Sequence, residues 1–161
     1  MKKLIALIVA GSCLGGLSAK EFYVSHLKDA DGNPYYEGAP KGTKIYENLG
    51  ELLVYWDCYS CTVWVEDGYV CNSGDEDSSG HSRLNLKGNN VILRSRSGDW
   101  RKGVTVIGQY ATGVDTGYGA DAIRGMVVNG SNSKIIGFKF LNGATRLGSY
   151  AGEASSCGGG A

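Results

Sequence analysis

Short runs of β-branched residues, each closed by a glycine or an Asn-Gly turn, recur toward the C-terminal end of the chain. The run at 104–107 ends at Gly108, and the run at 126–128 ends at Asn129-Gly130, 22 positions further on. A third run, 135–141, ends at a second Asn-Gly turn. Strands this short cannot bury both faces alone, so like strands are expected to stack on one another. The pattern predicts an all-β stack with a coil of about 22 residues.

The same strand-and-turn layout extends over the earlier part of the chain. It predicts strands at 21–25, 62–65, 69–71, 84–86 and 91–93. The last two flank an Asn-rich turn, and this layout returns at 126–140, with Ile92 and Ile136 separated by 44 positions, twice the proposed coil. Asparagine tolerates left-handed backbone at such turns and can hydrogen-bond to its neighbours in adjacent coils. We therefore expect asparagines to line up at the corners of the stack.

A helical period replaces this pattern between Lys44 and Trp56. The apolar positions on one face are Ile45, Leu49, Leu52, Leu53 and Trp56. Thr43 is the predicted N-cap, and Gly50 weakens the helix by about 1 kcal/mol relative to alanine. An amphipathic helix ahead of a strand stack would cover the open edge of its first coil. Trp56 and the strand residue Trp64 are expected to pack in the core or under the cap.

Residues 1–19 have the pattern of a secretory signal peptide, and they are excluded from the fold. Lys2 and Lys3 precede the apolar run 4–9, and Ala19 suits the residue before a signal-peptidase cut. This predicts a secreted protein, extracellular or at the cell surface, whose mature chain begins near Lys20. A lipoprotein signal ending at Cys13 is the alternative, although it would have a very short apolar core.

The charge of the predicted mature chain excludes one class of partner. Removing Lys2 and Lys3 leaves 14 basic against 16 acidic side chains, a net charge of −2. No basic stripe remains, so nucleic acid is not an expected partner. The sequence has no second apolar run, so no transmembrane segment is expected in the mature chain. The length of the chain favours one domain. The 26 glycines against two prolines exclude collagen and proline-rich linkers.

Three cysteines, Cys58, Cys61 and Cys71, lie within 14 residues of one another. In a secreted chain this clustering favours one disulfide within the group, without fixing which two residues pair. The C-x-x-C spacing of the first two also fits a zinc or redox motif. Zinc would need a second ligand pair, for which Cys71 and His81 are the nearest candidates, and a redox motif would need a βαβ surround that the pattern lacks.

Four segments together carry a resemblance to a known family. They are the opening 22–25 with its Asp/Gly/Asn/Pro loop, the strand and turn at 62–69, the repeat at 135–144, and the Gly-Gly-Gly-Ala at 158–161. In this order they resemble the start of a right-handed parallel β-helix of the pectin-lyase-like superfamily. More specifically, they are similar to secreted bacterial surface proteins with polymorphic-outer-membrane-protein-type repeats.

The resemblance implies a domain plan. Residues 20–57 would form an N-terminal strand, a loop and a capping helix, and 58–161 would form the first coils of the solenoid. The chain stops within a repeat motif, where a solenoid would expose an uncovered coil. We therefore expect an N-terminal fragment of a longer protein, with a complete small secreted module as the alternative.

Candidate metal and ligand residues are few. Asp75, Asp77 and Ser79 place oxygen ligands at alternate positions ahead of Gly80, as a calcium loop does. The twelfth position would be Leu86, so the EF-hand interpretation fails and only a looser calcium site remains, there or at Asp29 and Asp31. No other cofactor is expected. Among the aromatics, Tyr110 and Tyr118 lie in a Gly/Thr/Asp-rich loop and are the candidates for glycan contact.

No set of catalytic residues can be identified from this sequence. A polysaccharide lyase would need clustered carboxylates with a basic group, and a glycosidase would need two opposed carboxylates. The leading hypothesis is a non-catalytic extracellular β-helix that serves adhesion or contacts polysaccharide or cell-surface glycan. The alternative is the N-terminal part of a polysaccharide lyase or glycoside hydrolase whose catalytic coils lie beyond residue 161. The fold can carry both functions.

Overall fold

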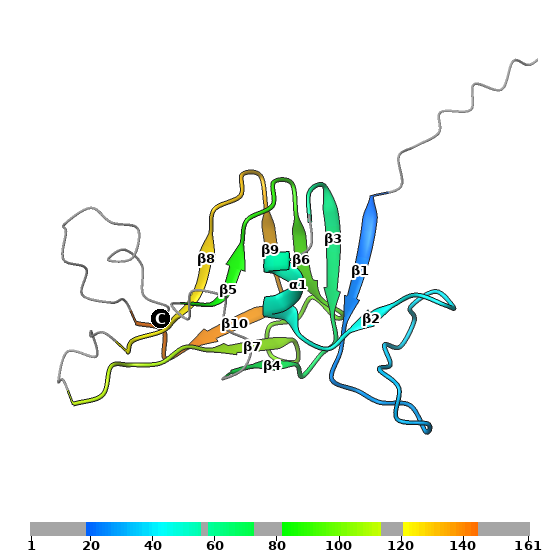
Figure 1. Cartoon of the computed structure of the whole chain (residues 1–161), viewed down its shortest axis with the longest axis horizontal. Helices are drawn as coiled ribbons and strands as arrows, with labels where there is room; N and C mark the ends of the chain where they lie inside the picture. The colour runs from blue at the N-terminus through cyan, green and yellow to red at the C-terminus, as the bar shows by residue number, and fades with distance from the viewer. Residues whose placement is uncertain (1–18, 56–57, 73–81, 114–120, 145–161) are drawn as a thin grey trace, which may run out of the picture.

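The computed structural model describes residues 19–55, 58–72, 82–113 and 121–144. This part of the chain is all-β: it consists mostly of strands in parallel sheets, with one short helix (Figure 1). The elements in chain order are β1 (Lys20–Val24), β2 (Ile45–Tyr46), α1 (Leu49–Tyr55), β3 (Cys61–Val65), β4 (Val70–Cys71), β5 (Ser82–Leu86), β6 (Ile92–Ser95), β7 (Val104–Ile107), β8 (Arg124–Val128), β9 (Lys134–Ile136) and β10 (Phe138–Leu141).

The strands form three sheets that the chain visits in turn. The strand orders are β2-β1-β3-β6-β9, β10-β7-β4 and β5-β8. β1 and β2 begin the five-stranded sheet. From there the chain passes through the five-stranded, the three-stranded and the two-stranded sheet in β3, β4 and β5, and it repeats this circuit in β6, β7 and β8. Every strand of the second circuit pairs in parallel with its counterpart in the first. β9 and β10 continue the same order in a third circuit.

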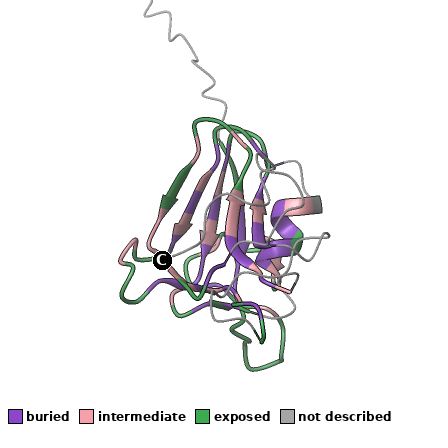
Figure 2. Ribbon diagram, turned by 90° about the vertical axis from the view of Figure 1, so that its left-hand side faces the viewer, coloured by how far each residue is buried: buried purple, intermediate pink, exposed green. Residues whose placement is uncertain are grey.

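Side chains from all three sheets share one core. Alternate residues of β3 and β7 are fully buried, as the pleat of a strand with one covered face requires. The fully buried members include Val63, Val65, Leu84, Leu86, Leu93, Val104 and Val106. Exposed residues lie mainly in the turns at the strand ends (Figure 2). The strands therefore enclose a single apolar interior.

The predicted 22-residue period is wrong. The runs at 104–107 and 126–128 belong to different sheets, since β7 lies in the three-stranded and β8 in the two-stranded sheet. Strands that do stack are further apart: Thr62 pairs with Ile92, 30 positions on, and Ile92 pairs with Lys134, 42 positions on. The strand–turn–strand layouts at 84–93 and 126–136 are therefore neighbours one circuit apart. The 22-residue spacing was misleading because it relates strands of similar sequence that are not hydrogen-bonded partners.

The predicted alignment of asparagines at the corners is confirmed for Asn90 and Asn132, and Ser60 occupies the equivalent position one circuit earlier. Ser60, Asn90 and Asn132 each precede a strand of the five-stranded sheet, and each has left-handed backbone, with φ of 50°, 56° and 53°. The amide of Asn90 lies 3.5 Å from the hydroxyl of Ser60 one circuit earlier. At the preceding turn position, Asn129 donates its side-chain amide to the amide oxygen of Asn85 at 3.0 Å. These bonds join consecutive circuits at the same corner.

The predicted helix exists, but its start at Thr43 is wrong. Ile45 and Tyr46 form β2 instead, which pairs with β1 at the edge of the five-stranded sheet. The side chain of Asn48 caps α1, because its Oδ1 accepts a hydrogen bond from the backbone amide of Glu51 at 2.7 Å. The helix packs against β5 and buries Leu49, Leu52 and Leu53. Trp56 lies outside the described residues.

A pair of substitutions tests the corrected helix start. Asn48→Ala is expected to cost about 1 kcal/mol of unfolding free energy, because the amide of Glu51 loses its acceptor. Thr43→Ala is expected to change stability by less than about 0.5 kcal/mol, since no cap depends on it. Urea unfolding followed by circular dichroism measures both values. A larger loss from Thr43→Ala would return the cap to the position that periodicity suggested.

Candidate ligand-binding face

The outward side of the five-stranded sheet carries a row of large side chains. Tyr23 of β1, Trp64 of β3 and Arg94 of β6 are direct neighbours in the strand register. Since Val63 and Val65 point into the core, Trp64 between them must point outward. The expectation that Trp64 packs in the core is therefore wrong: its side chain is half-buried on the outer face.

Glu21 and Arg94 hold the indole of Trp64 in place. The Nε1–H of Trp64 donates to Oε1 of Glu21 at 3.1 Å, and the guanidinium of Arg94 lies 4.5 Å from the ring centroid. Tyr23 donates its hydroxyl to the other oxygen of Glu21 at 2.8 Å. Burial raises the pKa of Tyr23, and the neighbouring Glu21 carboxylate raises it further. The result is a fixed row of acid, aromatic ring and cation.

A charged group flanks this row where the strands end. Glu66 and Arg96 follow β3 and β6, and they form an ion pair at 3.0 Å. The loop between β1 and β2 brings Glu37 to the same guanidinium, which therefore bridges two carboxylates. Both carboxylates raise the pKa of Arg96, Glu66 more than Glu37. Glu66 is only 4% exposed whereas the side chain of Arg96 is 39% exposed, so the ion pair joins a buried carboxylate to an exposed guanidinium.

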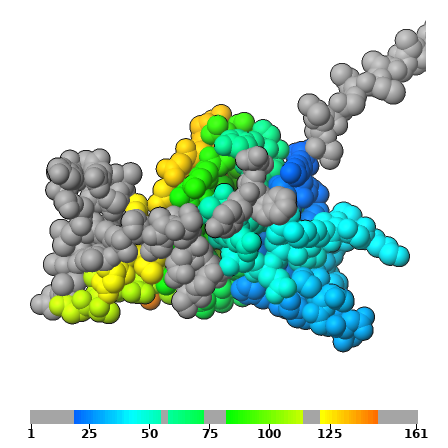
Figure 3. All heavy atoms as spheres, in the orientation of Figure 1, coloured from blue at the N-terminus to red at the C-terminus, as the bar shows by residue number. Residues whose placement is uncertain are grey.

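The loop between β1 and β2 also forms an aromatic wall. Tyr36 is buried and packs edge-on against Tyr23, with ring centroids 5.1 Å apart. Burial, followed by the charge of Glu66, raises the pKa of Tyr36 well above its ordinary value. In Figures 1 and 3 this segment, blue to cyan, projects at the right-hand end of the sheet. We use the term outer face for the set Glu21, Tyr23, Tyr36, Trp64, Glu66, Arg94 and Arg96.

Some buried polar atoms of the outer face have no hydrogen-bond partner among the described residues. Three buried atoms, the hydroxyl of Tyr36, Oε2 of Glu66 and Nε of Arg94, make no hydrogen bond within the described part of the chain. Most buried polar atoms in proteins have a partner, so such a concentration on one face is unusual. Three of the four such atoms found among the described residues therefore lie on the outer face.

Of the two glycan candidates predicted from the sequence, Tyr110 lies away from the outer face. Tyr110 follows β7 and is 55% exposed, as expected for a contact residue, while Tyr118 lies outside the described residues. The segment leaves and rejoins the stack through an antiparallel bridge between Gln109 and Ile123. Asp121 supports this stem by accepting hydrogen bonds from the amide and hydroxyl of Thr112. Tyr110 therefore lies directly after the bridge, at the start of the excursion, the name used here for the segment between Gln109 and Ile123.

Of the weak calcium candidates, the structure describes only Asp29 and Asp31. Asp75, Asp77 and Ser79 lie outside the described residues. The carboxylate of Asp29 accepts hydrogen bonds from the backbone amides of Asp31 and Asn33 at 3.0 and 2.8 Å, so it already closes its own loop. The amide of Asn33 is the main reason that the pKa of Asp29 is lowered. Among the described residues no group of three or more His, Cys, Asp or Glu could hold a metal ion.

The cysteine candidates are all buried. Cys58 and Cys61 are each 2% exposed, Cys71 is fully buried, and none of these three cysteines is in a disulfide in this structure. The predicted disulfide within the cluster stays a prediction. His81, the remaining member of the hypothetical zinc set, lies outside the described residues.

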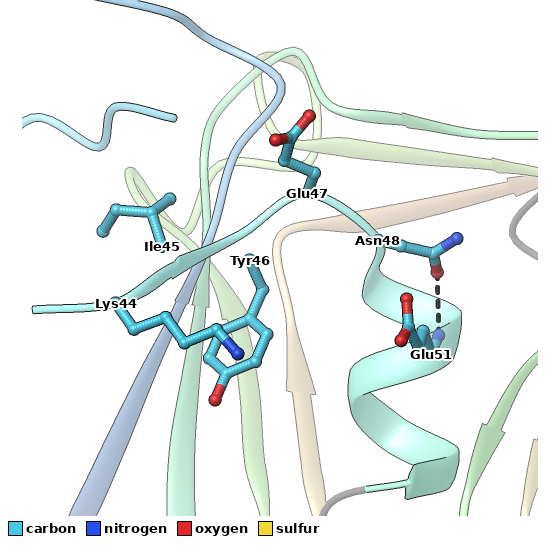
Figure 4. Close-up of a pocket in the computed structure, with 6 residues that line it drawn as sticks. All are labelled: Lys44, Ile45, Tyr46, Glu47, Asn48 and Glu51. Atoms are coloured by element: carbon cyan, nitrogen blue, oxygen red, sulfur yellow. Dashed lines mark hydrogen bonds between the residues drawn. The ribbon is translucent and has the colours of Figure 1, made fainter. Parts of the chain in front are cut away.

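A shallow cavity of about 250 Å³ lies between β2 and α1. Figure 4 shows that its side chains do not converge: Lys44 lies along the ring of Tyr46, whereas Glu47 points to the opposite side. Asn48 is engaged in the helix cap. Glu47 pairs with Lys28 at 2.6 Å. The cavity therefore offers neither a catalytic set nor a deep binding site.

Sequence reasoning missed Glu66, Arg94 and Arg96 as members of a site. The available signal was the outward alternation of Trp64 with Glu66 and of Arg94 with Arg96, two pairs 30 positions apart. It could be read only with the correct register, which the 22-residue period did not provide.

Comparisons with protein families, with curated proteins and with solved structures found no match to this chain. Within the described residues, no helix is both long and apolar enough to span a membrane.

Proposed function

We propose that this chain forms the first coils of a right-handed parallel β-helix, and that α1 is its cap. Three parallel sheets visited in turn, with like strands stacked and like corners joined, support this architecture. The position of α1 against β5 supports the capping role, since β5 is the first strand of its sheet. In this arrangement the interior is filled by side chains, and ligands have access only to the outside.

The function we propose is non-catalytic contact with a polysaccharide or cell-surface glycan, in a secreted surface protein. The supporting observation is the indole of Trp64 on the outer face, held between Glu21 and Arg94. An aromatic ring can pack against the apolar side of a sugar, while charged groups beside it hydrogen-bond to the hydroxyls. A flat strand surface also suits an extended polymer better than a small molecule.

An enzymatic role has less support on this face. A glycosidase needs one carboxyl group that can be protonated and a second that acts opposite it. Glu37 and Glu66 are instead both ion-paired with the same Arg96 guanidinium. Binding without bond cleavage is therefore the function that these contacts favour.

Binding to immobilised polysaccharides tests the proposed function. In a panel that includes neutral glucans, mannans and uronate-containing polymers, the polymer that binds most tightly should lose at least tenfold in affinity with Trp64→Ala. That loss corresponds to about 1.4 kcal/mol. The physical reason is the loss of the stacking surface while the strand, whose neighbours Val63 and Val65 form the core, is retained.

Trp100→Ala is the matched control. Trp100 is 53% exposed and also carries an arginine over its ring, Arg101 at 5.0 Å, but it lies in the turn between β6 and β7. The Trp100→Ala substitution should leave polysaccharide binding unchanged. Equal affinities of the wild-type and Trp64→Ala proteins, with unchanged circular dichroism, would contradict the outer-face site. A loss confined to Tyr110→Ala would move the contact to the excursion after β7.

A further inference from the structure

Cys58 and Cys61 meet at the turn that leads into β3. Both side chains are 2% exposed, and the thiol of Cys58 donates a hydrogen bond to the sulfur of Cys61. The left-handed backbone of Ser60, with φ of 50°, helps to form the tight turn between them. The contact with Cys58 lowers the pKa of Cys61, although burial opposes this effect. Two thiols in contact are positioned for covalent pairing.

Cys71 occupies a different place in the fold. It lies on β4 in the three-stranded sheet, where Val106 of β7 is its register partner. Cys61 begins β3 in the five-stranded sheet, opposite Lys20 of β1. The structure thus separates the three cysteines, which the sequence treats alike, into a contacting pair and a third residue on another sheet.

We propose that Cys58 and Cys61 form a disulfide when the chain meets an external disulfide oxidant, and that Cys71 remains a thiol. The Cys61 thiolate attacks one sulfur of the oxidant RS–SR, which forms a mixed disulfide and releases RS⁻. The Cys58 thiolate then attacks the sulfur of Cys61 and releases the second RS⁻. The two protons lost by the cysteines are taken up by the released thiolates, so two thiols become one disulfide and RS–SR becomes two RSH.

This bond would lock the turn between α1 and the first strand of the stack. Cys58 lies between α1 and β3 in the chain, and its carbonyl oxygen packs against Gly88 of the next circuit. Constraining this turn removes conformations from the unfolded chain and holds the carbonyl where the next circuit packs on it. The oxidised chain should accordingly unfold at a higher urea concentration than the reduced chain.

Peptide mapping tests the pairing without altering any of the three cysteines. The full chain carries Cys13→Ser and Cys157→Ser, is treated with oxidised glutathione, alkylated under denaturing conditions and digested with chymotrypsin. Cleavage after Trp56, Tyr59, Trp64 and Tyr69 places Cys58, Cys61 and Cys71 on separate peptides. The expected result is that the first two peptides stay joined until a reductant is added, while the third carries the alkyl group.

Single substitutions provide a second measurement on the same chain. Oxidation should lower the mass by about 2 Da, the loss of two hydrogens, in the parent chain and in Cys71→Ser, but not in Cys58→Ser or Cys61→Ser. A joined pair that includes Cys71 would overturn the proposal. So would alkylation of all three cysteines after oxidation, or a tightly held zinc ion that keeps the thiols reduced.

Discussion

Replacing Val106 by aspartate is expected to prevent the chain from folding. Val106 is fully buried at the centre of β7, where its register partners are Cys71 of β4 and Phe140 of β10. A carboxylate there would lie in an apolar core that draws its side chains from all three sheets. The expected cost, at least about 4 kcal/mol, is comparable to the whole stability of a small domain.

Thr105→Asp is the matched control, because it places the same charge one residue earlier on the opposite side of the strand. Thr105 is half-buried and pairs with Val70 and Lys139, so a carboxylate there has a lysine beside it. The control should fold, with a change in unfolding free energy below about 1 kcal/mol. Soluble, cooperatively unfolding Val106→Asp protein in a urea titration would contradict the inward position of Val106.

Gly88→Ala is expected to be nearly as damaging, although it adds only one methyl group. Gly88 is buried in the turn between β5 and β6, and a Cβ there would come within 1.7 Å of the carbonyl oxygen of Cys58. In the next circuit, a Cβ on Gly130 would come within 1.8 Å of the carbonyl oxygen of Gly88. These carbonyls belong to the backbone of neighbouring circuits, so no side-chain rotation relieves the clash.

Relief would require separating two circuits at this corner, where the asparagine bonds also lie. We therefore expect a loss of about 4 kcal/mol or more, measured as the midpoint shift in urea unfolding. Gly38→Ala is the comparison: its φ is 90° but nothing lies within 4 Å of the added Cβ. It should lose about 1–3 kcal/mol from backbone strain alone. Equal losses at the two glycines would mean that the two circuits separate easily at this corner, which would contradict the clash proposed for Gly88→Ala.

Local chemistry made part of the fold predictable. The alternation of β-branched residues located nearly all the strands, and the preference of asparagine for left-handed backbone located the corner at Asn90 and Asn132. These features depend on a few adjacent residues, so the sequence alone is sufficient to detect them.

Features that depend on strand partners could not be predicted in this way. Two strands of similar composition can belong to the same sheet or to neighbouring sheets, and only the register distinguishes the two cases. Trp64 was expected inside because it is large and apolar, yet the pleat around Val63 and Val65 places it outside. Ile45 fits a helical stripe, but pairing with Tyr23 of β1 draws it into β2. In each case a long-range contact overrides the local preference.

The unequal lengths of the circuits determine where this fold accepts additional sequence. From the two-stranded to the five-stranded sheet the chain takes ten positions in both circuits, Ser82 to Ile92 and Arg124 to Lys134. The whole difference between 30 and 42 residues therefore falls at the other two corners. Insertions and grafted peptides belong at those corners, above all between Gln109 and Ile123, which an antiparallel bridge already joins. The fold thus combines one corner of invariant length with two at which its surface can diversify.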